Sequence, residues 1–381
     1  MDNDALYLDR IVDATELLIE NIPKLDNSKS HADRADFFLK LAIAYFIQND
    51  KPKAQSYILE AINIISENSD EIFISLVNIW QQIIFDAISF EDRLSKMNGN
   101  QKRIFEIVLW YSSLIYHEIP REYAEALSCV IQGSLIFCSK KMMCNPIEKK
   151  NFPLDFDTDK ELFFFTVSGK KLYYAGNDIK YILHNFEFTN QIEQQPYSPH
   201  LYFTEEFCVR TGDVFCDIGA GEANIALSVV DKCSEVYVFE GDEKWMDALT
   251  ATFMPFKSKS TIIRKKVSDI SSDDFINLDD YFDDRRVDFL KIDVEGYELN
   301  VLHGAKNVIK NNPQLRMCIC TYHKGCDAYK IKDFLDGYGF KIEFSDGFML
   351  FNEDPDFYIG SAPEYPYFRY GLIRAWREEI I

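Results

Sequence analysis

Three side chains that can take a proton or hold a metal ion follow two apolar runs in the second half of the chain. Asp293 and Glu295 come just after VDFLKI, and His323 comes directly after RMCICTY. Parallel strands bring their carboxyl ends to one edge of a sheet, where open α/β sheets bind ligands, so we expect these residues to converge. Together they could act as a general base for a hydroxyl, or could hold a divalent metal that acidifies it.

Each of the three residues also has a purely structural interpretation. Asp293 could cap the following helix, Glu295 could be a first-turn acid favoured by the helix dipole, and His323 could be a loop residue with satisfied polar groups. Lys291, inside the apolar run, could pair with a carboxylate or extend its ammonium group past the edge. Residues 297–298, Tyr-Glu, are expected to begin the next helix and pack.

A glycine-rich loop lies between a buried strand and an apolar helix in the segment DVFCDIGAGEANIAL, residues 213–227. Gly219 and Gly221 allow a tight turn and a close approach of the backbone to a ligand. The helix that follows offers unpaired N–H groups at its start. A loop of this kind is a candidate nucleoside site.

An acidic residue supports the nucleoside interpretation. Glu240 ends the next apolar run, EVYVF, 21 residues after Gly219, where its carboxylate can accept hydrogen bonds from two ribose hydroxyls. Position 224 is Asn224, so the loop lacks the third small residue of the pyrophosphate-binding spacing. This departure favours S-adenosylmethionine over NAD as the ligand.

The end of the third predicted strand supplies the remaining cofactor candidates. Ser268 and Asp269 follow KKV, where an adenine ring would lie, and Trp245 or Met246 could cover a ring face. The alternative for these residues is helix capping and core packing. The predicted cofactor-binding set is Asp217, Gly219, Ala220, Gly221, Asn224, Glu240, Gly241, Ser268 and Asp269.

Short apolar runs alternate with helical stretches from residue 208 to residue 352, as in a parallel sheet covered by helices. We expect strands near 213–217, 235–240, 261–267, 287–293, 315–322, 339–344 and 348–352. Ser345-Asp346-Gly347 predicts a hairpin between the last two. An α/β sheet that ends in an antiparallel strand is typical of class I methyltransferases, whereas a dinucleotide-binding sheet continues with crossovers.

The remaining segments differ from this domain in composition. Residues 1–141 carry apolar residues at helical spacing and are predicted to form an all-α domain, either a bundle or one tetratricopeptide-like hairpin with its turn at 49–52. Residues 142–207 are predicted to contain a β-hairpin around Ser168-Gly169 and a connector or lid. Residues 353–381 form an aromatic C-terminal extension that could close over the site.

Aromatic stretches at both borders of the α/β domain are candidates for an acceptor pocket, because aromatic faces stack on sugar C–H surfaces. His200 and Tyr202, just before the first strand, are the residues we would test first. The other histidines show no metal-binding spacing and are expected to be structural or surface residues: His31, His117, His184 and His303.

The charge balance limits the partners. With 62 acidic and 41 basic residues, the net charge of −21 disfavours nucleic acid and anionic lipid as partners. We expect neither a signal peptide nor a membrane span. Nine cysteines without metal spacing or pairing pattern suggest a reducing cytoplasm. The helical domain could bind a protein partner or a second copy of the chain.

Four segments resemble the FkbM family of methyltransferases: DVFCDIGAGEAN, VFEGDEKW, VDFLKIDVEGYELNVLHGAKNVI and YHKGCDAYKIKDFL. The resemblance covers residues 198–352. It implies a class I fold, S-adenosylmethionine as donor and methylation of a hydroxyl, often on a sugar of a glycan or natural product. Gly221 and Ala223 depart from the family's first motif, which often has asparagine and glycine there. Alanine is small, so we expect donor binding to be preserved.

Two other functions compete with an O-methyltransferase. An NAD-dependent oxidoreductase is opposed by Asn224 and by the predicted terminal hairpin. A non-catalytic scaffold, in which a methyltransferase fold is joined to a helical interaction domain, is opposed by the four acidic and histidine residues still present at the site: Asp217, Glu240, Asp293 and His323.

Overall fold

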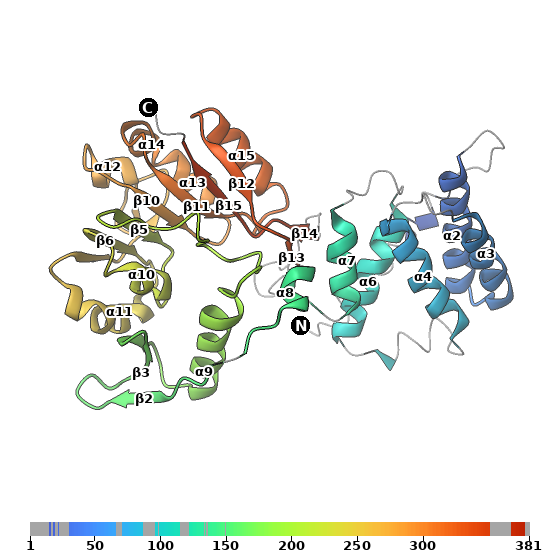
Figure 1. Ribbon diagram of the computed structural model, residues 1–381, viewed down its shortest axis with the longest axis horizontal. Helices are drawn as coiled ribbons and strands as arrows, with labels where there is room; N and C mark the ends of the chain where they lie inside the picture. The colour runs from blue at the N-terminus through green and yellow to red at the C-terminus, as the bar shows by residue number, and fades with distance from the viewer. Residues whose placement is uncertain are drawn as a thin grey trace. The chain divides into compact units, whose positions relative to one another are not determined.

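The computed structural model describes residues 30–65, 71–86, 96–97, 99–114, 122–132, 134, 136–148, 150–350 and 367–377, together with 15–16, 18–19 and 22. The chain divides into two compact units (Figure 1). One unit comprises Met1–Lys140 and Asn352–Pro363, and the other comprises Lys141–Phe351 and Glu364–Ile381.

The first unit is helical, which confirms the helical N-terminal region. Its described elements are α2 (His31–Ile47), α3 (Lys51–Ile64), α4 (Glu71–Phe85), α6 (Gly99–Ser113), α7 (Tyr123–Ile131) and the short strand β1 (Phe137–Cys138). Ser30 and Asp33 form a capping box that starts α2, and the Asp50 side chain accepts from Lys53 N to start α3. The turn between α2 and α3 therefore lies where Asn49 to Pro52 predict it, and the two helices pack on each other.

The second unit contains a seven-stranded sheet with the order β12-β15-β11-β10-β5-β6-β7. Its strands are β5 (Val214–Ile218), β6 (Glu235–Phe239), β7 (Ser260–Ile263), β10 (Phe289–Ile292), β11 (Arg316–Cys320), β12 (Lys341–Phe344) and β15 (Leu372–Trp376). The pairs β7-β6, β6-β5, β5-β10 and β10-β11 are parallel. The carboxyl ends of β5 and β10 therefore lie side by side, as the site requires.

The antiparallel strand is not the one that the sequence predicts. β15 lies between β11 and β12 and runs antiparallel to both, whereas β13 (Phe348–Leu350) pairs with β14 (Phe368–Arg369) in another sheet. The predicted hairpin between 339–344 and 348–352 is thus wrong. After β12 the backbone N–H of Ser345 donates to Leu372 O, and its hydroxyl accepts from the backbone of Gly371, so the chain end of β12 is tied to β15 instead.

The third predicted strand, 261–267, is also divided. β7 ends at Ile263, and β8 (Lys266–Val267) pairs with β9 (Phe275–Ile276) in a separate two-stranded sheet. Arg264 and Lys265 lie between the two parts, so the charged residues interrupt the apolar run.

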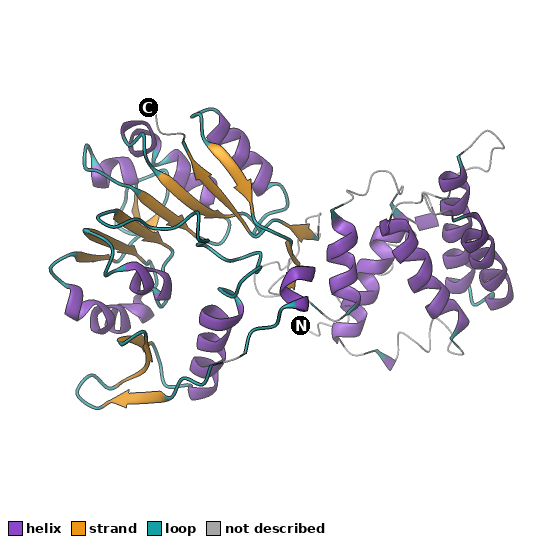
Figure 2. Cartoon of the chain, in the orientation of Figure 1, coloured by secondary structure: helices purple, strands orange, loops and turns teal. Residues whose placement is uncertain are grey.

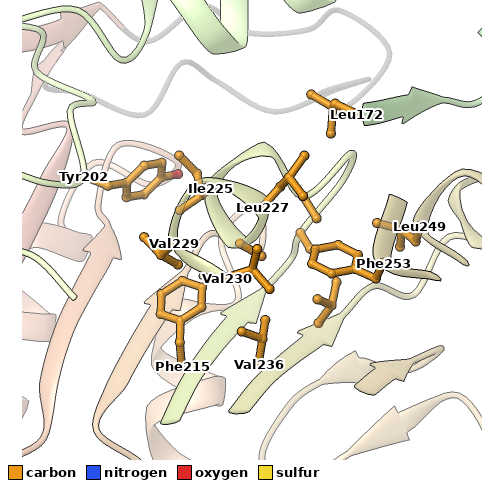
Figure 3. Close-up of a cluster of buried hydrophobic side chains, with 14 of the residues drawn as sticks. Leu172, Tyr202, Phe215, Ile225, Leu227, Val229, Val230, Val236, Leu249 and Phe253 are labelled. Carbon is orange, nitrogen blue, oxygen red and sulfur yellow. The ribbon is translucent and has the colours of Figure 1, made fainter. Parts of the chain in front are cut away.

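Helices cover both faces of the large sheet (Figure 2). On one face, α10 (Asn224–Val229) and α11 (Met246–Phe253) pack on Phe215, Val236 and Phe289. Figure 3 shows side chains of both helices above Phe215 and Val236: Ile225, Leu227 and Val229 of α10, and Leu249 and Phe253 of α11. On the other face are α12 (Leu278–Phe282), α13 (Glu298–His303), α14 (Lys306–Asn311) and α15 (Asp327–Asp336). Because both faces are buried, the strands are almost continuously apolar.

The segment that precedes β5 packs largely within the second unit, against the core on the α10–α11 face of the sheet. It contains α8 (Lys140–Cys144), β2 (Leu154–Asp157), β3 (Leu162–Val167), β4 (Lys170–Tyr174), α9 (Ile179–Glu187) and the π-helical turn η2 (Phe188–Ile192). Strands β3 and β4 form the predicted hairpin around Ser168-Gly169, where both residues have positive φ. Leu172 and Tyr174 of β4 are buried in the same cluster as α10 and α11. Whether residues 142–207 act as a connector or as a lid stays a prediction.

No helix among the described residues combines the length and the apolar character that crossing a bilayer would need.

Candidate functional site

The glycine loop after β5 is held in place by the end of β10. Gly219 has φ +72°, and a Cβ atom at this position would lie 1.8 Å from the backbone oxygen of Asp293. Lys291 Nζ donates to Gly219 O over 2.8 Å. Only glycine fits this close approach, and the lysine fixes the direction of the loop carbonyl.

Asp217 stabilises the glycine loop through Lys291 and through the first turn of α10. It is fully buried, Lys291 Nζ lies 3.0 Å from its Oδ1, and Ala226 N donates to its Oδ2 over 3.2 Å. Burial raises the pKa of Asp217 against the effect of Lys291. Burial by itself would lower the pKa of Lys291, but the Asp217 and Asp293 carboxylates raise it overall. Lys291 therefore pairs with a carboxylate, and Asp217 positions the predicted cofactor loop.

Glu240 follows β6 and faces the same loop. Its Oε2 accepts from Gly221 N over 2.8 Å, and its Oε1 accepts from Asp242 N over 2.7 Å. Each carboxylate oxygen has a second lone pair, so the half-buried side chain can still accept from ribose hydroxyls. Ala220 is buried, and its backbone N–H donates to Phe239 O, the residue before Glu240. Gly241 lies against the side chain of Lys266.

The predicted adenine side of the site is more open. Asp269 is exposed, and hydrogen bonds from Asn300 Nδ2 and Ser268 Oγ lower its pKa. The ring of Trp245, which we considered as a cover for the adenine, is buried and packs edge-on against Tyr174, whereas Met246 is half-buried.

Asp293 lies at the centre of a polar cluster at the end of β10. Tyr202 OH donates to its Oδ2 over 2.8 Å, His200 Nε2 lies 3.8 Å from the same oxygen, and His323 Nε2 lies 3.7 Å from Oδ1. Burial would raise the pKa of Asp293, but Lys291 and the two histidines outweigh it and lower the pKa to about 2. Asp293 is therefore an ionised carboxylate at neutral pH.

The partner of His323 is Glu298, not Glu295. His323 Nδ1 lies 2.9 Å from Oε1 of the fully buried Glu298, whose Oε1 also accepts from Val294 N and Gly296 N. Burial would lower the pKa of His323, but Glu298 raises it overall. Glu295 is exposed with φ +52°, and in the part of the chain that the structure describes no hydrogen bond joins it to Asp293 or His323. The Glu295 charge contributes less than Glu298 and Asp293 to raising the pKa of His323, and a direct role of Glu295 stays a prediction.

His200 and Tyr202 lie behind Asp293. Both are buried, and His200 Nδ1 lies 2.9 Å from Glu193 Oε1. Tyr202 OH also lies 3.4 Å from His200 Nε2 and 3.4 Å from Cys320 Sγ. The sequence suggested His200 and Tyr202 as acceptor contacts. In the structure they contact the Asp293 carboxylate from its buried side.

Sequence reasoning missed three residues that hold this cluster: Glu193, Glu298 and Arg369. The Arg369 guanidinium donates to the backbone oxygens of Tyr322 and His323 over 2.9 Å each, and thereby fixes the loop after β11. For Glu298 a signal existed, since it lies five residues after Asp293 at the start of the next helix. Glu193 and Arg369 are distant in sequence, and no pattern points to them.

Two groups of described residues could offer a metal three ligand atoms within 4.8 Å of one another. In the group of His200, Asp293 and Cys320, the Tyr202 hydroxyl contacts all three side chains. In the group of Asp293, Glu298 and His323, the buried Glu298 Oε2 has no hydrogen-bond partner. The second group is therefore the better candidate.

The sheet order, the single antiparallel strand inserted between β11 and β12, the glycine loop after β5 and the acid after β6 define a class I methyltransferase fold. Residues 176–342 match the methyltransferase FkbM domain, and this part of the chain belongs to that family. The domain is thus an S-adenosylmethionine-dependent methyltransferase. No curated protein matches the chain.

Solved structures show weaker similarity. A precorrin-6y C5,15-methyltransferase from Geobacter metallireducens is 14% identical, with a TM-score of 0.30 over 44% of this chain and 82% of that one. A putative tRNA (m1A22) methyltransferase from Streptococcus pneumoniae with bound S-adenosyl-L-methionine is 13% identical, with a TM-score of 0.30 over 45% and 70%. Neither similarity adds to the assignment that the family match and the sheet topology carry.

Proposed function

We propose that this protein transfers a methyl group from S-adenosylmethionine to a hydroxyl group of a carbohydrate acceptor. The observation that supports O-methylation is the Glu298–His323 pair beside Asp293, at the carboxyl edge of the sheet and next to the glycine loop. The resemblance to the FkbM family supports a sugar of a glycan or natural product as acceptor. The net charge of −21 argues against nucleic acid.

The donor would be held by the loop from Gly219 to Asn224, with Glu240 on the ribose hydroxyls and Ser268 and Asp269 at the adenine. When bound, S-adenosylmethionine supplies a methyl group that is already activated, so the protein has to orient the acceptor oxygen and remove its proton.

His323 is the proposed general base. Glu298 at Nδ1 favours the tautomer whose proton is on Nδ1, which leaves the Nε2 lone pair free toward Asp293 and the acceptor. In the transfer, the acceptor oxygen would bond to the methyl carbon while the methyl–sulfur bond of the donor breaks, which leaves the neutral thioether S-adenosylhomocysteine. The acceptor O–H bond would break at the same time, and its proton would move to Nε2 of His323. The ionised Asp293, 3.7 Å away, stabilises the resulting imidazolium.

Donor identity is the first test. We would titrate the protein with S-adenosylmethionine and, separately, with NAD by calorimetry, with Glu240→Ala as the variant. Binding of S-adenosylmethionine that the substitution weakens at least tenfold supports the site, and an acceptor screen with Asp293→Asn and His323→Ala then follows. Binding of NAD alone would contradict the donor assignment, and donor binding without turnover on any acceptor would favour the scaffold.

A divalent metal is the second candidate for activation of the hydroxyl. The ligands would be Asp293, His323 and the unpartnered Glu298 Oε2, with two oxygens and one nitrogen suited to a first-row divalent cation. Methyl transfer that is lost after dialysis against a chelator and restored by Mn²⁺ or Zn²⁺ would support the metal. Full activity after the same dialysis would leave His323 as the base.

We also propose that the helical unit binds a protein partner or a second copy of the chain, and that the protein works in the cytoplasm. Sedimentation of the full chain would show self-association directly, and a monomer at all concentrations would leave only a different protein as the partner.

A further inference from the structure

The π-helical turn η2 holds the glycine loop at its first residues. Thr189 Oγ1 donates to Glu222 Oε1 over 2.6 Å, and Asn224 Nδ2 donates to Thr189 O over 3.2 Å. Glu222 is buried, and burial raises its pKa to about 7. The loop that is proposed to bind the donor is thus fastened to η2 by a side chain on each side of Ala223.

The C-terminal end of η2 contacts His200 and Tyr202, the two buried residues that lie next to Asp293. Glu193 is the C-cap residue that directly follows η2, and its Oε1 lies 2.9 Å from His200 Nδ1. Gln194 accepts from Tyr202 N and donates to His200 O over 3.0 Å. His200 and Tyr202 in turn contact Asp293 Oδ2.

The short distance along the chain makes η2 a stiff connection. Thr189 and Glu193 are four residues apart, and Glu193 N donates to Phe188 O over 2.8 Å to close the π-helical ring. π-helical turns are rare and often occur at functional sites. A shift of the glycine loop on donor binding would therefore displace Thr189, and with it Glu193 and the His200 ring.

We propose that Thr189 and Glu193 are positioning residues and that η2 transmits occupancy of the donor loop to His200 and Asp293. This inference rests on the proposed function, because it assumes that the donor binds at the glycine loop.

The test uses the full chain with ¹⁵N-labelled histidine and S-adenosylhomocysteine as the probe. In the wild type, saturating probe is expected to shift the His200 imidazole signals, which are assigned from their absence in His200→Gln. In Thr189→Val, probe affinity is expected to fall about tenfold. At saturation the His200 shift is expected to be lost, whereas Thr189→Ser, which keeps the hydroxyl, restores both.

Glu193→Gln tests the second contact. We expect it to change the proton distribution between the two His200 nitrogens while the probe affinity stays within about twofold, which a loss of folding would not produce. The matched control is Ser271→Ala, which removes a hydroxyl–carboxylate bond of the same length, 2.6 Å, from Ser271 to Asp280. It should behave as the wild type.

The outcomes are distinct. A His200 shift of wild-type size in saturated Thr189→Val would overturn the connection through η2, and so would an unchanged His200 tautomer in Glu193→Gln. If the wild type does not bind the probe at all, the proposed donor site is wrong, which is a separate result.

Discussion

The Nδ1 atom of His323 lies 2.9 Å from Oε1 of Glu298, a carboxylate that is 0% exposed. This places a fixed acid behind the imidazole while Nε2 faces Asp293. Buried histidine–carboxylate pairs of this kind orient the ring and stabilise its protonated form. If His323 is the base, as we propose, the fold sets both its tautomer and the direction of its Nε2 atom.

Glu298→Gln should lower kcat for methyl transfer about 100-fold, because the amide stabilises the imidazolium less and fixes the tautomer less well. Donor affinity, measured by calorimetry, should stay within about twofold. The matched control is Glu295→Gln, which removes an exposed acid three positions away and should retain wild-type kcat. Equal losses of kcat in Glu298→Gln and Glu295→Gln would contradict a specific role of Glu298.

The pH dependence of methyl transfer follows from His323. Its pKa is raised in the folded protein, and the base must be neutral, so the rate should rise with pH through that raised pKa and then level off. Glu298→Gln should move the rising limb to lower pH, since the carboxylate that raises the pKa is gone. The check is a profile of log kcat against pH for both proteins; limbs that coincide would show that another group titrates.

The contribution of His323 to stability is expected to fall as pH rises, whereas the rate of methyl transfer is expected to increase. A group whose pKa is raised on folding stabilises the native state when protonated, fully below its unfolded pKa of about 6.5, and less as pH rises through the folded pKa. The difference in free energy of unfolding between the wild type and His323→Gln should therefore decrease from pH 6 toward pH 9, as measured by urea denaturation. A difference that grows over this range would contradict the raised pKa.

Lys291→Met should destabilise the protein by about 3–5 kcal/mol, because it leaves the buried Asp217 without its cation. The double variant Lys291→Met/Asp217→Asn removes both charges and should recover part of that free energy of unfolding. Denaturant unfolding measures both. Additive losses in the double variant would mean that the pair is not coupled.

Gly219→Ala should abolish donor binding and destabilise the fold, because the new Cβ would lie 1.8 Å from the backbone oxygen of Asp293. Gly212→Ala is the matched control: Gly212 also has positive φ, +87°, but a Cβ there meets nothing within 4 Å. It should cost only the conformational penalty of about 1–2 kcal/mol and leave donor affinity unchanged. Calorimetry and thermal unfolding separate the two cases.

The sequence by itself determined the elements whose signals are local. The apolar runs of β5, β6, β10 and β11 and the glycine loop each lie within a few residues, so their period and turn residues are readable without the fold. The order of these elements also fixed which residues end the strands, and Asp293 and His323 do meet, with 3.7 Å between Nε2 and Oδ1.

Only the tertiary structure decided which partners these residues have. Glu295 and Glu298 are equivalent by composition, but the positive φ at Glu295 and Gly296 turns the chain so that Glu298 enters the core. Tyr202 is 91 residues from Asp293, and β15 is far from the strands it separates. Such contacts arise from the packing of the whole domain. A local sequence pattern does not show which distant segment will pack against it.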